Sequence, residues 1–185
     1  MKRVLTIAGI ITATVIVLIG ILYLFVLSGA IFMFNSNPPT PEVTYGEFPI
    51  KVVYEINGEM KVVEDTVVCK FDGFEDLGSS GKYRKWKAHL KSGNKRLTLL
   101  KGENKNILFE ISVSYGQPDY YMGDLRYESE EEYKKKLVDS RYFGYTQWEN
   151  KTQKGYSISK EEVWEKYKLR VINIQYSSPI KNTFK

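Results

Sequence analysis

Residues 50–71 read IKVVYEINGEMKVVEDTVVCKF. Ahead of the Asn57-Gly58 pair, apolar side chains recur at every second position, at Ile50, Val52, Tyr54 and Ile56. A period of two is typical of a strand with one buried face, and Asn-Gly is typical of a two-residue hairpin turn. A second strand is expected from Met60 to Phe71. The stretch therefore predicts a β-hairpin around which the rest of the chain folds.

Further strands are expected downstream of this hairpin. Residues 85–90 and 96–100 flank Ser92-Gly93-Asn94, which predicts a second hairpin, and residues 107–115 alternate clearly enough to predict a fifth strand. The turns between these strands are too short for crossover helices, so the strands should pair antiparallel.

The second half of the chain contains helix signals. Ser129 and Ser159 are each followed three residues later by a glutamate, which matches the capping box that begins a helix. Helices are therefore expected at residues 130–138 and 160–167. The intervening residues 142–156 predict a loop or a short strand, and residues 169–176 alternate as a last strand that joins the sheet. The predicted fold class is α+β: an antiparallel sheet of five or more strands with two short helices.

A long apolar run precedes this domain. The 31 residues from Val4 to Phe34 carry no charge, and as a helix they would reach about 46 Å, beyond the ~30 Å of a bilayer core. Lys2 and Arg3 precede the run, and no Lys or Arg follows until Lys51. This asymmetry predicts a single-pass plasma-membrane protein with a cytoplasmic amino terminus and an extracellular domain. A cleaved signal peptide ending near Ala30 is the alternative to an uncleaved signal-anchor.

Three regions are predicted from these patterns. Residues 1–34 form a transmembrane anchor in contact with the lipid bilayer through residues 4–34. Residues 35–44 contain three of the six prolines, which favours an extended spacer of about 30 Å. Residues 45–185 form the extracytoplasmic α+β domain.

Several kinds of catalytic and metal site have no support in the sequence. Cys69 is the only cysteine and alternates with Val67 and Phe71, so it is expected to be a small buried hydrophobe. His89 is the only histidine and should be exposed beside lysines. One Cys and one His do not make a common zinc site or a catalytic triad, and no Gly-rich phosphate loop is present. No catalytic residue, cofactor or metal is predicted.

Carboxylates are the remaining catalytic option, because glycosidase chemistry needs only two of them at a set separation. The candidates near predicted turns are Glu64, Asp65, Asp72, Glu75, Asp76, Asp119 and Asp124.

Charge is unevenly distributed along the domain. Residues 41–79 hold nine acids and three bases, whereas residues 82–105 hold nine bases and one acid. The two blocks either neutralise each other across the sheet or leave an exposed basic face that binds an anionic envelope polymer or lipid headgroups. Nucleic acid is not expected as a partner of an extracytoplasmic domain. The candidate basic surface comprises Lys82, Arg84, Lys85, Lys87 and Lys91.

Tyrosine is abundant, with 14 residues in the chain. Tyrosines either line a glycan- or peptide-binding surface or form the outer layer of a small β-rich core. Tyr120 and Tyr121, next to Pro118 and Gly123, are the pair most expected to be exposed.

The runs Gly46–Pro49, Val53–Glu59 and Val63–Cys69 resemble small, uncharacterised membrane-anchored proteins of Gram-positive, Firmicutes-type bacteria. The resemblance implies a bacterial plasma-membrane protein with an exported domain, and it implies no activity and no site residues.

These observations favour a non-enzymatic binding or accessory domain at the cell surface, whose partner is an anionic envelope polymer or another membrane protein. The alternatives are a carboxylate-dependent hydrolase of cell-envelope glycans and a stabilising subunit of a membrane complex.

Overall fold

The computed structural model describes residues 13–27, 37–76, 78, 81–104, 107–138, 142–149 and 152–185. The chain divides into two compact units. The N-terminal unit comprises Met1–Pro39 and Gly73–Lys85, and the main unit comprises Thr40–Asp72 and Trp86–Lys185.

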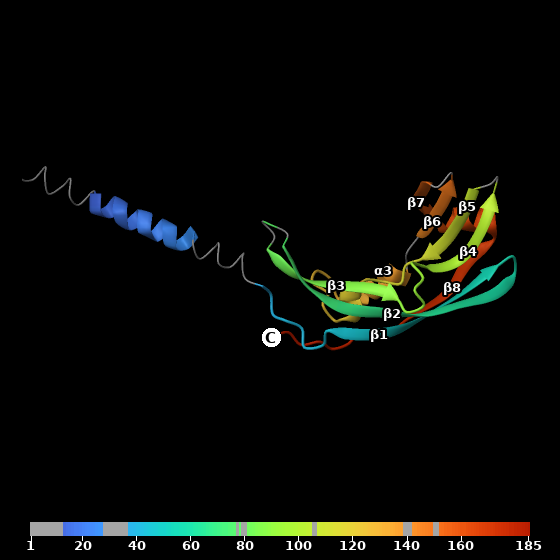
Figure 1. Cartoon of the computed structure of the whole chain (residues 1–185), viewed down its shortest axis with the longest axis horizontal. Helices are drawn as coiled ribbons and strands as arrows, with labels where there is room; N and C mark the ends of the chain where they lie inside the picture. Colours follow the sequence, from blue (N-terminus) through green and yellow to red (C-terminus); the bar gives the residue numbers. More distant parts are fainter. Residues whose placement is uncertain are drawn as a thin grey trace, which may run out of the picture. The chain divides into compact units, whose positions relative to one another are not determined.

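Two antiparallel sheets, with a few short helices, make up the fold seen in the described residues (Figure 1). The first sheet has the strand order β3-β2-β1-β8 and the second has the order β4-β5-β6-β7. This arrangement is consistent with the predicted α+β class. The strands are β1 (Tyr45–Ile56), β2 (Glu59–Asp76), β3 (Lys82–Leu90), β4 (Leu97–Asn104), β5 (Ile107–Val113), β6 (Tyr142–Glu149), β7 (Thr152–Ser159) and β8 (Leu169–Tyr176).

The hairpin predicted from residues 50–71 is confirmed. Strands β1 and β2 pair antiparallel with Val53 opposite Val62. Between them, Asn57 and Gly58 have φ angles of 53° and 84°, the left-handed values that a type I′ turn requires. On β1, Ile50 and Val52 are buried while the alternate residues are more exposed.

The second predicted hairpin is wrong, and so is the single sheet of five or more strands. Strand β3 lies in the first sheet, whereas β4 begins the second sheet and pairs with β5. The connection between them is held against β2, because the Asp65 carboxylate accepts hydrogen bonds from the Ser92 hydroxyl at 2.5 Å and the Ser92 N–H at 3.2 Å. The chain therefore leaves the first sheet at this point instead of turning back along β3.

The last three strands of the chain complete the two sheets. Residues 142–159, of which 142–156 were expected to form a loop or short strand, contain the paired strands β6 and β7. The last strand, β8, joins the first sheet as predicted, by pairing with β1.

Both predicted capped helices are confirmed as α3 (Glu130–Val138) and α4 (Lys160–Tyr167). Ser129 Oγ accepts from the Glu132 N–H at 3.2 Å, and Ser159 Oγ accepts from the Glu162 N–H at 3.1 Å. A shorter helix, α2 (Pro118–Tyr121), was not predicted.

One hydrophobic core joins the two sheets of the main unit. Tyr54 on β1 is buried and donates its hydroxyl hydrogen to the Leu99 carbonyl on β4 at 2.8 Å. Helix α2 packs into the same core, because the Tyr121 ring stacks on Phe48 with 4.8 Å between the ring centroids.

Part of the predicted proline-rich spacer belongs to the folded main unit. Thr40 and Lys185 exchange backbone hydrogen bonds of 2.6 and 2.9 Å, and Pro41 forms a β-bridge with Phe184. Residues 40–44 are thus held beside the carboxyl-terminal segment.

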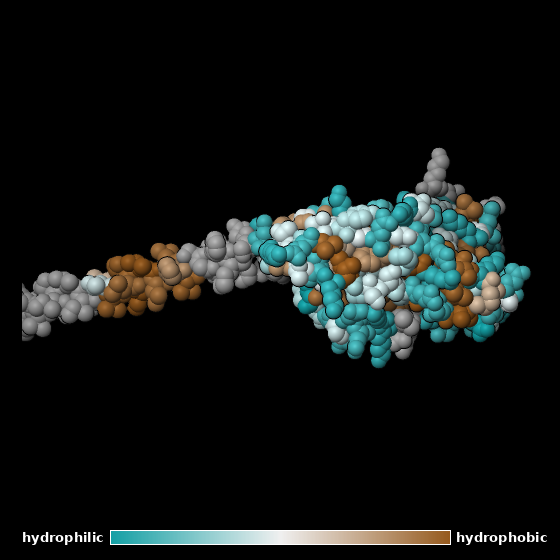
Figure 2. Space-filling view, turned by 90° about the horizontal axis from the view of Figure 1, so that it is seen from below, coloured by the Kyte–Doolittle hydropathy of each residue, from teal (hydrophilic) through white to brown (hydrophobic). Residues whose placement is uncertain are grey.

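The N-terminal unit contains a helix over residues 13–27, whose side chains are mostly apolar (Figure 2). Within the described residues, no helix is both long enough and apolar enough to span a membrane. This finding contradicts the predicted transmembrane anchor over residues 4–34 and, with it, the predicted single-pass plasma-membrane location and topology. Residues 4–12 and 28–34 lie outside the described part of the chain.

Candidate functional site

The predicted basic surface begins in the N-terminal unit, where Lys82, Arg84 and Lys85 lie on β3. Arg84 donates to the Pro39 carbonyl at 3.2 Å. Lys85 forms an ion pair of 3.2 Å with Glu75 on β2. Arg84 and Lys85 are thus engaged by neighbours in their own unit.

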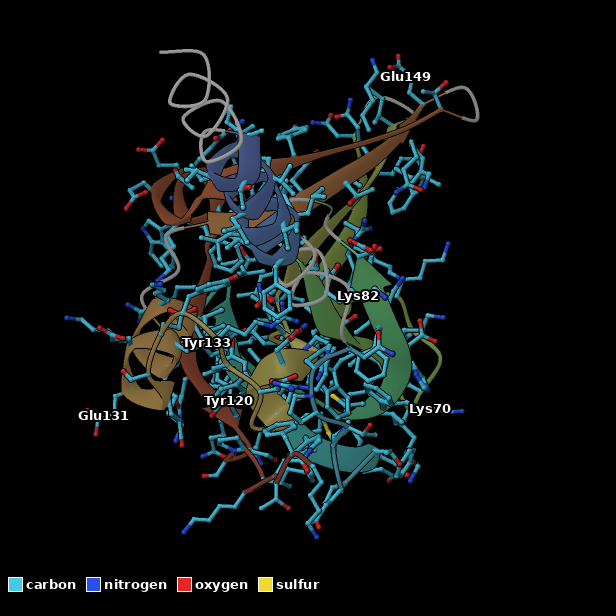
Figure 3. The ribbon with its side chains drawn as sticks, turned by 90° about the vertical axis from the view of Figure 1, so that its left-hand side faces the viewer. Lys70, Lys82, Tyr120, Glu131, Tyr133 and Glu149 are labelled. Atoms are coloured by element: carbon cyan, nitrogen blue, oxygen red, sulfur yellow. The ribbon has the colours of Figure 1, made fainter. Side chains whose placement is uncertain are left out.

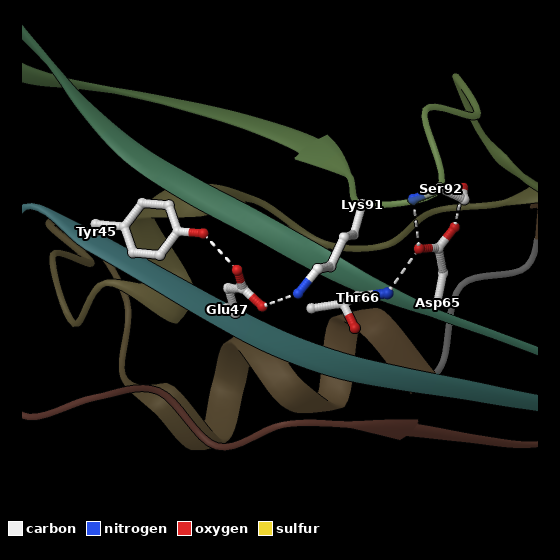
Figure 4. Close-up of polar contacts among 6 residues, drawn as sticks. All are labelled: Tyr45, Glu47, Asp65, Thr66, Lys91 and Ser92. Atoms are coloured by element: carbon white, nitrogen blue, oxygen red, sulfur yellow. Dashed lines mark hydrogen bonds and ion pairs between the residues drawn. The ribbon is translucent and has the colours of Figure 1, made fainter.

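The rest of the basic surface lies in the main unit and is also paired. Lys87 forms an ion pair of 2.9 Å with Asp72, and Lys91 forms one of 2.6 Å with Glu47 (Figure 4). Two hydrogen bonds lower the pKa of the Glu47 carboxyl. The bond from Lys91 has the larger effect, and the bond from the Tyr45 hydroxyl has the smaller one. Exposed pairs of this kind add little to the stability of a fold, but they neutralise the charge that an anionic polymer would need to meet. Binding of such a polymer to β3 stays a prediction.

The prediction that Tyr120 and Tyr121 are exposed is wrong, because both side chains are fully buried. The Tyr121 hydroxyl donates to the Tyr115 carbonyl at 2.6 Å, and the Tyr120 hydroxyl donates to the Ser177 carbonyl at 3.3 Å. Burial raises the pKa of Tyr121 above its ordinary value.

The Tyr120 ring also stacks on Tyr133 of α3, with 4.8 Å between the ring centroids (Figure 3). Helix α2 is a single turn packed between the first sheet and α3, so both of its tyrosines face protein. They extend the core instead of offering a contact surface.

The candidate carboxylates are each engaged separately. Asp124 is 3% exposed and accepts a hydrogen bond of 2.8 Å from the Trp86 indole. Glu64 pairs with Lys51 at 2.7 Å, and the Asp65 carboxylate accepts hydrogen bonds from Ser92. Each of these carboxylates is therefore held by its own partner.

Cys69 and His89 lie where the sequence predicts. Cys69 is fully buried, and burial raises the pKa of its thiol to about 12. His89 is exposed on β3. Within the described residues, no three His, Cys, Asp or Glu side chains are grouped as a metal site requires.

A cavity of about 450 Å³ lies in the main unit where the two sheets meet, bordered by β5, α3, β6, the start of α4 and β8. We call it the junction cavity. The lining runs from the core to the surface, because the lining residue Phe143 is 3% exposed and the lining residue Ile172 is 50% exposed. Among the described residues, the apolar lining consists of Val113, Leu137, Phe143, Val171, Ile172, Ile174 and Tyr176.

Polar side chains stand around the same cavity: Ser114, Gln117, Glu128, Lys136, Lys160 and Asn173. Lys136 and Glu128 form an ion pair with each other. Lys160 has no carboxylate partner in the described part of the chain.

Tyr133 brings a phenol to the junction cavity and is 5% exposed. Its oxygen accepts a hydrogen bond of 2.7 Å from the Gln117 N–H. Burial raises the pKa of Tyr133 to about 12, against a smaller lowering by that hydrogen bond. The phenol therefore keeps its proton at neutral pH and can donate it.

A second hollow of about 590 Å³ lies over β1, β2 and β8. Its polar groups satisfy one another: Lys51 pairs with Glu64 at 2.7 Å, and the Ser177 hydroxyl donates to the Pro49 carbonyl at 2.6 Å. Its lining includes Lys51, Glu64, Asp65, Thr66 and Gln175, with few large apolar side chains. This hollow offers a ligand less apolar area and fewer unused donors than the junction cavity.

The residues of the junction cavity were not selected by the sequence analysis. Tyr133 and Phe143 fall in the tyrosine-rich stretch, so the aromatic bias was a partial signal. Lys160 and Asn173 carried no signal, since a single lysine at a helix start and a single asparagine in a strand are ordinary.

Comparison of the chain with known protein families, with curated proteins and with solved structures finds no match. The resemblance to membrane-anchored proteins of Gram-positive bacteria is untested and stays a prediction. No activity or ligand comes to this chain from a relative.

Proposed function

We propose that this protein is a non-enzymatic binding module whose ligand site is the junction cavity. The observation that carries the proposal is a cavity of about 450 Å³ with an apolar lining and a border of polar side chains. Binding sites for small ligands have volumes of about 300–1,000 Å³ and combine apolar walls with a few polar groups that orient the ligand.

The position of the cavity supports the proposal. Its walls come from three strands and helix α3, and the deepest apolar residue, Phe143, is 3% exposed and belongs to the core of the main unit. A site built on such elements is already formed before a ligand arrives, which lowers the entropy lost on binding.

The alternatives receive less support. On the predicted basic surface, Lys85, Lys87 and Lys91 are each paired with an acid, and Tyr120 and Tyr121 are buried. A carboxylate pair suited to glycan hydrolysis would need to converge on one space with both groups available. Glu128 is the one carboxylate among the described residues that line the junction cavity. Glu64 and Asp65 line the second hollow, but each is held by a partner.

The test is to titrate the full chain with octanoate and with octanol, and to follow backbone amide shifts by NMR. These probes share one apolar tail and are small enough for the cavity. Binding of either probe, with the largest shifts at residues that line the cavity, is the expected result. No binding of either probe, or shifts confined to another surface, would overturn the proposal.

A matched pair of variants makes the test specific. Leu137 lines the cavity, whereas Leu108 is 54% exposed on β5 and does not. Leu137→Trp should fill the cavity and weaken probe binding at least tenfold, while Leu108→Trp should leave it unchanged. If Leu137→Trp fails to fold, Ile172→Trp serves instead, because that lining residue is half exposed and tolerates a larger side chain. Unchanged binding in the filled variant contradicts the site.

A further inference from the structure

We propose that the ligand of the junction cavity is an amphipathic organic anion, whose apolar tail lies on the cavity lining and whose single carboxylate lies beside Lys160. This inference rests on the proposed function and adds the chemical class of the ligand.

Charge at the border of the cavity is the first observation. Among the described residues, three charged side chains line it: Glu128, Lys136 and Lys160. Glu128 and Lys136 form an ion pair and cancel each other. Lys160 is exposed at the first position of α4 and has no carboxylate partner among the described residues, so the described lining carries one net positive charge. A ligand with one negative charge complements this border.

Hydrogen-bond donors are the second observation. The phenol of Tyr133 has its oxygen occupied by the Gln117 N–H at 2.7 Å, so its hydrogen is the group it can offer a ligand. The side-chain amides of Gln117 and Asn173 add further N–H donors at the border. A carboxylate has only acceptor oxygens and can use several of these donors together.

The apolar lining is the third observation, because it excludes a small inorganic anion as the best occupant. A sulfate or phosphate ion would leave Val113, Phe143 and Ile174 without a partner. An alkyl or aromatic tail covers this area and gains roughly 25 cal/mol per Å² of apolar surface removed from water, a figure from general transfer data. A cation is disfavoured as well, because Glu128, the one carboxylate among the described lining residues, is already paired with Lys136.

The experiment compares three probes with one tail: octanoate, octanol and octylamine. Each is titrated into the full chain at low and at high salt, with affinity measured by calorimetry and position by NMR. Octanoate should bind about three to ten times more tightly than octanol at low salt, and octylamine should bind most weakly. The preference should shrink at high salt, because exposed charges are screened.

Variants assign the preference to one side chain. Lys160→Gln should abolish the preference of octanoate over octanol. Lys154 is an exposed lysine on β7 that does not line the cavity, so Lys154→Gln should keep the preference. A preference that survives Lys160→Gln, or that Lys154→Gln also abolishes, would overturn the inference.

The remaining outcomes separate the two proposals. Equal binding of all three probes in the cavity, or tighter binding of octanol or octylamine, would overturn the anion inference and leave the cavity as a binding site. Absence of binding by all three probes would overturn both.

Discussion

Gly123 occupies a position where a left-handed backbone and a close backbone contact coincide. Its φ angle is 65°, and a Cβ atom added there would lie 2.4 Å from the Ile180 carbonyl oxygen. An ordinary van der Waals contact begins near 3.4 Å, so the carboxyl-terminal segment would have to move by about 1 Å. Such a movement would break the hydrogen bond of 3.0 Å from the Ile180 N–H to the Tyr121 carbonyl.

The expected effect of Gly123→Ala follows from these contacts. A left-handed backbone costs alanine about 1–2 kcal/mol, and the lost hydrogen bond adds about 1 kcal/mol. With the disturbed packing around Tyr121, the free energy of unfolding should fall by about 2–4 kcal/mol.

Gly58 supplies the matched control. Its φ angle is 84°, and an added Cβ atom there meets nothing within 4 Å. Gly58→Ala should therefore lower the free energy of unfolding by only about 1–2 kcal/mol, the backbone contribution alone. Urea unfolding followed by tryptophan fluorescence measures both variants. Equal losses in the two variants, within about 0.5 kcal/mol, would refute the claim that the Ile180 contact limits position 123.

Three further outcomes are expected. Tyr121→Phe should lower the free energy of unfolding by about 1–2 kcal/mol, because it removes the hydrogen bond from a buried side chain to the Tyr115 carbonyl. Tyr127→Phe, at a side chain that is 94% exposed, should change it by less than about 0.5 kcal/mol, and similar urea midpoints for the two variants would contradict the burial of Tyr121. Cys69, fully buried with its pKa raised to about 12, should react with a thiol reagent near pH 8 only as fast as the protein unfolds, and immediate stoichiometric labelling would disprove its burial. Burial raises the pKa of Asp65, but hydrogen bonds from Ser92 and from the adjacent backbone outweigh this effect, so the pKa in the folded protein lies below the ordinary 3.8. The stabilisation that the Asp65 carboxylate contributes is therefore complete above pH 3.8 and is lost as the pH falls through the folded pKa. Asp65→Asn should accordingly flatten the acid side of the stability profile, and an unchanged profile would contradict the role of this carboxylate.

The candidate contact surfaces show where prediction from sequence reached its limit. The opposite charges of residues 41–79 and 82–105 predicted either mutual neutralisation or an exposed basic face. The ion pairs of Lys87 with Asp72 and of Lys91 with Glu47 support mutual neutralisation. Exposure of Tyr120 and Tyr121 was predicted wrongly, because one helical turn has no periodicity from which a buried face can be recognised.

The sequence by itself determined those features whose interactions join near neighbours. The Asn57-Gly58 turn depends on backbone angles within two residues, and the capping boxes at Ser129 and Ser159 join groups three residues apart. Forming such short-range contacts costs little conformational entropy, and the residues that make them can be recognised from their spacing in the sequence.

Only the tertiary structure decided how the strands divide into two sheets and what surrounds the cavity between them. Asp65 holds Ser92 across 27 positions of sequence, and the junction cavity collects Tyr133, Lys160 and Asn173 from three different elements. These residues meet because burial of one shared core brings distant elements together, and that requirement appears in no local pattern.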